Sequence, residues 1–168
     1  MYEDYLARAL SNVIISRQAI YGFEIIHQKD LKNGASYHAQ HAIELMLKFC
    51  IYNNAGYNKN SSNIQQLRTH DINRLITQYC VPLGIDVPKK IAKNAKTYST
   101  WEAESRYSLS YSVRIDSVKT ALDKIEQWLI KLKPTYRNKI LQVRNKLNVL
   151  VRFYITNIPT ALTSRLLW

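Results

Sequence analysis

YHAQHAIELMLK, residues 37–48, is the stretch of this sequence that most clearly indicates a fold. Its apolar side chains recur every three or four residues, which is the spacing of one face of an α-helix. They are Ala39, Ala42, Ile43, Met46 and Leu47. The alanines would let a second helix approach closely, and Glu44 with Lys48 forms a favourable i,i+4 pair on a polar flank. The stretch therefore predicts a packed helix, which we extend from about Ala35 to Ala55.

Outward from this stretch, helical periodicity covers most of the chain. Apart from 35–55 it predicts helices at about 3–28, after Thr69-His70-Asp71, from Val87-Pro88 to Tyr107, at 115–132, and again beyond Pro134. Asn33-Gly34 suits positive φ and predicts a turn over residues 30–34, and the polar residues 56–68 predict an exposed loop. No segment predicts a strand. The expected fold is all-α, an antiparallel up-down helical bundle.

Composition restricts the class of protein further. Only four Gly and four Pro occur in 168 residues, too few for the frequent turns of a sandwich or barrel. Cys50 and Cys80 lie far apart in apolar patterns, which favours two buried reduced thiols over a disulfide. No signal peptide and no apolar run of membrane-spanning length is discernible, so we expect a cytoplasmic protein.

Net charge is +12, and most of it lies near the C-terminus. No acidic residue follows Glu126. The basic residues from there on are Lys131, Lys133, Arg137, Lys139, Arg144, Lys146, Arg152 and Arg165. We therefore expect two units, a helical bundle at 1–133 and a basic amphipathic C-terminal helix and tail at 134–168.

Three segments resemble, in order and character, the HEPN family of helical-bundle domains. Residues 37–48 are similar to the family's second helix, with its Ala-x-Glu and following Lys. Arg68-Thr69-His70-Asp71-Ile72 is similar to the His-Asp-Leu that opens the third helix. Residues 101–108, WEAESRYS, resemble the Arg-Tyr-Pro signature before the last bundle helix, with Ser108 in place of Pro. The resemblance covers about residues 3–132 and implies a HEPN-like bundle that forms a homodimer.

That resemblance implies two kinds of activity. Family members include metal-independent RNases of toxin–antitoxin, CRISPR-associated and phage-defence systems, and companions of small nucleotidyltransferases. The RNases carry an arginine that is followed, after four to six residues, by a histidine. The arginine stabilises the anionic transition state, and the imidazole of the histidine moves a proton. None of the histidines here (27, 38, 41 and 70) stands at that distance after an arginine. Enzymatic activity is therefore left open.

Arg106, Tyr107 and His70 are the first candidate site residues. Arg106 could bind a phosphate with Tyr107 stacking on a base, or it could form a structural pair with Glu102. His70 could approach Arg106 to form a composite catalytic pair, or it could simply adjoin a helix cap made by Thr69 or Asp71. Both alternatives stay open at this stage.

His38 and His41 stand three residues apart, so they share one side of a helix. A metal site would need further ligands, and no Cys or acidic cluster accompanies them in the sequence. We therefore expect no metal and no cofactor, and we interpret the two histidines as surface or dimer-contact residues.

The basic C-terminal helix has three interpretations. Its cations, chiefly Lys139, Arg144 and Lys146, could contact an RNA backbone. They could meet an anionic membrane surface, which we consider less favoured. Alternatively the apolar seam of Tyr136, Ile140, Val143, Leu147, Leu150 and Tyr154 docks on the bundle or on a twin subunit and leaves the charges in solvent.

The sequence therefore predicts an RNA- or nucleotide-binding or interaction module that lacks the family's nuclease motif and is a possible partner of a nucleotidyltransferase. The alternative is a divergent metal-independent RNase of a toxin–antitoxin or phage-defence system.

Overall fold

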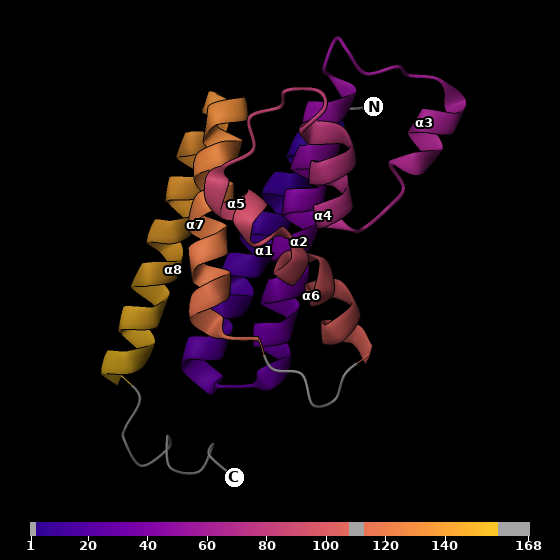
Figure 1. The fold of residues 1–168 in the computed structure, drawn as a ribbon. Coiled ribbons are helices and arrows are strands. Elements are labelled where there is room, and N and C mark those ends of the chain that lie inside the picture. Colours follow the sequence, from indigo (N-terminus) through magenta and orange to yellow (C-terminus); the bar gives the residue numbers. More distant parts are fainter. Residues whose placement is uncertain (1–2, 108–112, 158–168) are drawn as a thin grey trace.

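The computed structural model describes residues 3–107 and 113–157, without the side chains of Glu3, Ser61, residues 104–107, Ile155 and Asn157 (Figure 1). Within these ranges the chain is all-α, and its helices pack as a bundle without any strand. The α-helices are α1 (Glu3–Ile26), α2 (Lys29–Tyr52), α3 (Ser61–Gln66), α4 (Ile72–Leu75), α5 (Lys89–Lys93), α6 (Ala95–Tyr107), α7 (Ile115–Leu132) and α8 (Arg137–Asn157).

The first two helices form a tight hairpin, and the predicted turn over residues 30–34 is wrong. Lys29 already begins α2, and the chain reverses at His27, whose φ is 54°. Because His27 takes the left-handed conformation, Asn33 and Gly34 are free to continue the helix. The close approach of the helices falls at Gly22, where an added Cβ would lie 3.1 Å from the Leu31 side chain.

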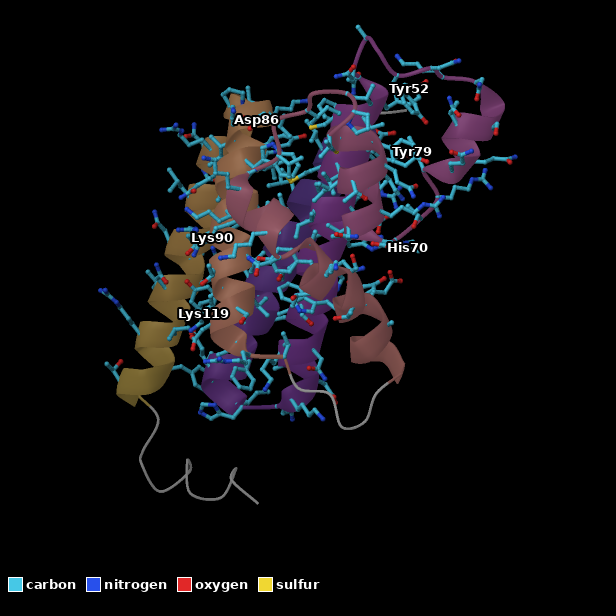
Figure 2. All side chains as sticks on the ribbon, in the orientation of Figure 1. Tyr52, His70, Tyr79, Asp86, Lys90 and Lys119 are labelled. Atoms are coloured by element: carbon cyan, nitrogen blue, oxygen red, sulfur yellow. The ribbon has the colours of Figure 1, made fainter. Side chains whose placement is uncertain are left out.

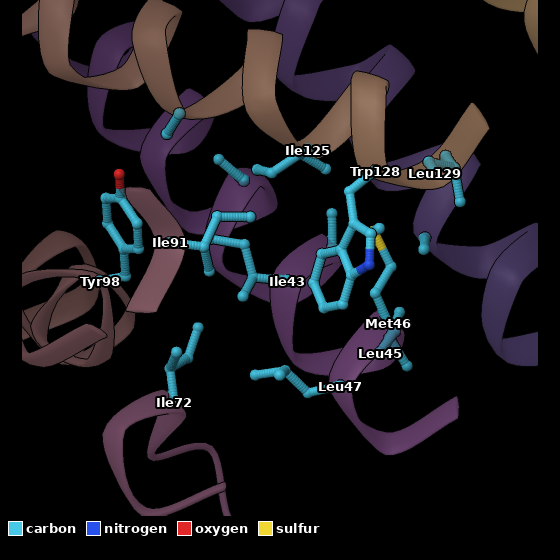
Figure 3. Packing of buried hydrophobic residues seen from close by; sticks show 14 of the residues in the cluster. Ile43, Leu45, Met46, Leu47, Ile72, Ile91, Tyr98, Ile125, Trp128 and Leu129 are labelled. Atoms are coloured by element: carbon cyan, nitrogen blue, oxygen red, sulfur yellow. The ribbon is translucent and has the colours of Figure 1, made fainter. Parts of the chain in front are cut away.

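The core surrounds α2, the central helix of the bundle. Its stripe of Ala39, Ala42, Ile43, Met46 and Leu47 is fully buried, as the sequence predicted. Figure 3 shows Ile43 close to Ile91 and Ile125, and the ring of Trp128 beside Met46. The apolar residues of α1, α6 and α7 join the same cluster. One continuous core therefore connects segments that are widely separated in sequence.

The segment between α2 and α4 is more ordered than the predicted loop. Asn60 caps α3, accepting a hydrogen bond from the Asn63 amide, and Tyr57 and Leu67 on either side are buried. After α4 the helix widens into a π-helical turn, Ile76–Cys80, and Gly84 with φ 64° ends it. The predicted stop at Pro82-Gly84 is therefore confirmed.

Helix α7 has the predicted bounds, and α8 follows it after a 3₁₀ turn at Pro134–Tyr136. Helix α8 packs along α1, beside α7 in Figure 1. Of its predicted seam, Tyr136 and Ile140 are buried, while Leu150 and Tyr154 are exposed. The first half of the seam therefore docks on the chain's own bundle, and the second half does not.

The described helices also bear on membrane insertion. None of those found in residues 3–107 and 113–157 combines the length and the apolar character needed to cross a bilayer.

Candidate functional site

Glu44, in the middle of α2, is the hub of a polar cluster inside the bundle. Its side chain is only 3% exposed. Oε1 accepts a hydrogen bond from Lys48 Nζ at 2.6 Å, and Oε2 lies 3.0 Å from Nδ1 of His70. A buried carboxylate is stable only when it is paired in this way. The predicted i,i+4 pair of Glu44 and Lys48 is therefore confirmed. The polar flank on which it lies is buried, because the segment before α4 and helix α6 cover it.

Local interactions in the segment before α4 place His70. Thr69 Oγ1 accepts the Asp71 amide, and Asp71 caps α4 by accepting the Arg74 amide. Gln40 of α2 donates Nε2–H to the backbone carbonyl of His70 at 3.3 Å. These bonds fix the backbone around His70, so the imidazole is held against Glu44. Figure 2 shows His70 at the side of the molecule where the chain enters α4.

Helix α6 completes the cluster. The Glu102 amide donates to Gln40 Oε1, and Glu102 Oε2 lies 3.5 Å from His70 Nδ1. Arg106 follows Glu102 by four residues, one turn later on the same helix. The side chains of Arg106 and Tyr107 lie outside the described residues. The structure thus brings His70 to α6 within one turn of the predicted partner and describes no contact between the two side chains.

His38 and His41 have different surroundings. Nδ1 of His38 is 2.8 Å from Asn12 Oδ1, and burial, followed by the nearby His41, lowers the pKa of His38. His41 instead stacks on His70 with ring centroids 6.1 Å apart. Its Nδ1 is buried, has no hydrogen-bond partner among the described side chains and lies 3.8 Å from Glu44 Oε2. Only His41 therefore belongs to the cluster.

The cluster is suited to proton transfer. The His70 side chain is 57% exposed, so a substrate can reach it, while a buried carboxylate holds one ring nitrogen. A carboxylate in that position orients an imidazole and stabilises its protonated form. The geometry thus provides an accessible, oriented acid or base.

A second feature is a cationic cavity of about 470 Å³ between α5, α6 and the start of α7. Lys90, Lys93 and Arg114 line it, together with a single carboxylate, Asp116. None of the three cations forms an ion pair with any part of the chain that the structure describes. The remaining lining residues are Asn94, Thr97, Tyr98, Trp101, Ser117 and Thr120.

The floor and one end of this cavity are also suited to a ligand. In Figure 3 the Tyr98 ring borders the apolar core and directs its hydroxyl away from it. Burial raises the pKa of Tyr98, and a hydrogen bond with Asn94 opposes that shift, so the hydroxyl stays protonated at neutral pH. Arg114 is the N-cap residue of α7, and its own side chain does not cap that helix. The first amides of α7 therefore receive no hydrogen bond from the N-cap side chain.

The predicted cations of α8 separate into two groups. Lys139 and Lys146 are exposed. Arg144 Nη2 lies 2.6 Å from Asp123 Oδ1 and also contacts Glu126 Oε2, so it ties α8 to α7. Its guanidinium has a structural role, whatever the two lysines bind.

Sequence reasoning did not identify Lys90, Lys93 and Arg114. The sequence does place Lys90 and Lys93 shortly after Pro88, and Arg114 directly before α7. These positions indicate a common site only when it is known that the two segments face each other. Sequence reasoning also did not identify Glu44 as a site residue, because its histidine partner, His70, lies 26 residues away along the chain.

Comparisons with known proteins add nothing to these observations. No family model matches the sequence, and neither the curated proteins nor the solved structures contain a match.

Proposed function

We propose that this chain is a HEPN-like module that binds a nucleotide or the nucleotide units of RNA. The observation that carries the proposal is the cationic cavity, in which three basic side chains, without an ion pair to the described part of the chain, line a space at the N-terminus of α7. Elsewhere in the described chain, buried cations such as Arg17 and Lys48 are paired with carboxylates. A surplus of cations in a concave site favours an anionic ligand.

The shape and chemistry of the cavity point to a nucleotide rather than to a bare anion. Lysine, arginine and the first amides of a long helix are the usual phosphate ligands. Tyr98 and Trp101 are buried in the core and form the floor of this space. A volume of about 470 Å³ exceeds what a phosphate alone needs and lies in the range of small-molecule sites.

The test is binding of fluorescently labelled ATP, AMP and a short single-stranded RNA by the purified chain, followed by anisotropy. We expect saturable binding that Lys93→Ala and Arg114→Ala each weaken about tenfold, since each removes one charge-assisted contact. Lys131→Ala removes the same charge from the far end of α7 and serves as the matched control. Absence of saturable binding, or equal binding by all variants, would contradict the proposal.

The basic α8 helix supplies the other route to RNA, and the same assay separates it. A Lys139→Ala/Lys146→Ala double variant removes two exposed cations without touching the cavity. If only this variant weakens binding, the RNA lies along α8 and the cavity proposal is wrong. If it leaves binding intact while Lys93→Ala reduces it, the cavity is the site.

A partnership also belongs to the proposal. The family resemblance supports a homodimer and a small nucleotidyltransferase as companion, and the uncovered end of the α8 seam leaves apolar surface for one of them. Sedimentation of the full chain tests whether it forms a homodimer. Co-purification with a nucleotidyltransferase encoded beside it tests the companion. A monomer that binds no such companion would contradict the proposed partnership.

The second candidate function is a divergent metal-independent RNase of a toxin–antitoxin or phage-defence system. One observation favours it: His70 is exposed, is held by buried Glu44, and adjoins α6 one turn before Arg106. The test is incubation with labelled tRNA and single-stranded RNA, with His70→Ala and Arg106→Ala beside the parent. Cleavage that neither substitution reduces would exclude this pair from the mechanism.

A further inference from the structure

His41, Glu44 and His70 present three metal-ligand atoms to a common point. These atoms, one from each residue, lie within 4.8 Å of one another. Glu44 Oε2 is 3.0 Å from His70 Nδ1 and 3.8 Å from His41 Nδ1. Bonds of about 2.0–2.2 Å to a tetrahedral ion separate its ligand atoms by roughly 3.4 Å. The two separations from Glu44 Oε2 lie close to that value, one slightly below it and one slightly above it.

The state of His41 provides an independent reason to expect a ligand. Its Nδ1 is fully buried and makes no hydrogen bond to any group that the structure describes. Leaving a polar nitrogen unpaired in the interior destabilises the folded state. A buried nitrogen that lies near a carboxylate oxygen, beyond hydrogen-bond distance, has room for a ligand between the two atoms.

The surroundings hold the donors in place. Lys48 Nζ binds Oε1 of Glu44 at 2.6 Å, which turns the other oxygen toward the imidazoles. Gln40 binds the backbone carbonyl of His70. Such outer interactions orient the ligands of metal sites. Glu102 brings a second carboxylate oxygen to 3.5 Å from His70 Nδ1, so an acidic donor also borders the remaining coordination position.

We propose that His41 Nδ1, His70 Nδ1 and Glu44 Oε2 bind a divalent transition-metal ion of the zinc type. Two imidazoles and one carboxylate are a ligand set that Zn²⁺ uses in proteins, with water or another donor in the fourth position. A metal ion binds only unprotonated imidazole nitrogen, so binding to this site weakens as the pH falls.

This site would give the chain a link that its sequence does not show. The ion would join the middle of α2 to the segment before α4, which otherwise depends on hydrogen bonds. The proposal is independent of the cationic cavity, because no residue lines both. It also differs from the expectation that the chain has no metal site, since the ligands missing beside His41 in the sequence come from the tertiary fold.

The experiment uses the full chain without an affinity tag, treated with chelator and titrated with Zn²⁺ by calorimetry and with Co²⁺ by visible absorption. We expect one ion per chain and the intense d–d bands of four-coordinate Co²⁺. Zn²⁺ should also raise the melting temperature, because it binds only the folded state. His41→Ala and His70→Ala should each weaken binding by more than about 100-fold, the upper end of the loss seen for outer-sphere ligands.

His38→Ala is the matched control. It removes an imidazole from the same helix, three residues before His41, that bonds to Asn12 instead of facing Glu44. Circular dichroism of each variant shows whether the bundle is retained. Absence of Co²⁺ bands in the parent chain overturns the proposal, as does equal loss of binding in the His38 and His41 variants.

Discussion

Arg17 on α1 donates Nε–H to Oε1 of Glu126 on α7 at 2.7 Å, across 109 residues of sequence. Both side chains are almost completely buried. Arg17 also contacts Asp123, and Arg144 of α8 binds the same two carboxylates. Burial by itself would lower the pKa of Arg17, but the two carboxylates outweigh it and raise that pKa. The network holds α1, α7 and α8 together.

Glu126→Gln should therefore be strongly destabilising. The substitution keeps the shape of the side chain and removes the charge that lies between Arg17 and Arg144. Breaking one partner of a buried pair costs about 3–5 kcal/mol, and the remaining Asp123 places the expected loss near the lower end. Urea denaturation followed by circular dichroism measures it. A free energy of unfolding equal to that of the parent would show that the network contributes nothing.

The pair of Lys131 and Asp86 gives the contrasting case. Lys131 Nζ lies 2.9 Å from Asp86 Oδ2, but the two side chains are 71% and 82% exposed. Solvent screens such a pair, so Lys131→Ala should change the free energy of unfolding by less than about 1 kcal/mol. The same denaturation experiment compares it directly with Glu126→Gln. A larger loss would mean that Lys131 has a role beyond this ion pair.

Helix α8 should be stable in its first half and fray in its second. Ile140 is 3% exposed against α1 and the core, whereas Leu150 is 59% exposed. Ile140→Ala should cost about 2–4 kcal/mol through lost burial and a cavity, and Leu150→Ala about 0.5 kcal/mol or less. Amide exchange gives a second measurement, with slow exchange near Ile140 and fast exchange near Leu150. Similar effects of the two substitutions would instead indicate that another surface covers the second half.

Gln40→Ala should loosen the segment that carries His70. The Gln40 side chain, which is buried, bonds to the His70 carbonyl and to the Glu102 amide, so its removal leaves both backbone groups unpaired. We expect a loss of about 2–3 kcal/mol and faster exchange of the Glu102 amide. Gln66→Ala, which removes a partly exposed contact to Tyr79, is the control. Unchanged exchange at Glu102 would exclude Gln40 as the link between α2 and α6.

Both cysteines should react slowly in the folded chain. Burial raises the pKa of Cys50 to about 11, and burial followed by the neighbouring Cys50 raises that of Cys80 to about 12. The reactive thiolate is therefore rare at pH 8. Because both folded pKa values exceed the ordinary value of 9.0, the stability contributed by the two buried protonated thiols is present at neutral pH and is lost as the pH rises from about 9 to about 12. Labelling with iodoacetamide at pH 8, in buffer and in urea, should be fast only after unfolding, and Cys80 should react last.

Much of the fold could be predicted from the sequence, because helices depend on local patterns. The apolar stripe of residues 37–48 predicted the buried face of α2, and the spacing at 115–132 predicted α7 to its ends. Pro82 and Gly84 likewise predicted the end of the helical segment before them. In each case the determining interactions are between residues three or four positions apart, or in the backbone of one residue.

Only the tertiary structure decided where the polar side chains lie. Glu44 and Lys48 look like a surface pair until the segment before α4 and helix α6 cover them, and His41 gains its neighbours only when His70 folds back onto α2. Arg144 looks like a free cation until α8 packs beside Asp123. The cavity of Lys90, Lys93 and Arg114 exists only because α5 faces the start of α7. Sequence periodicity determines which face of a helix is apolar, whereas the partner of a charge depends on which helices meet in space.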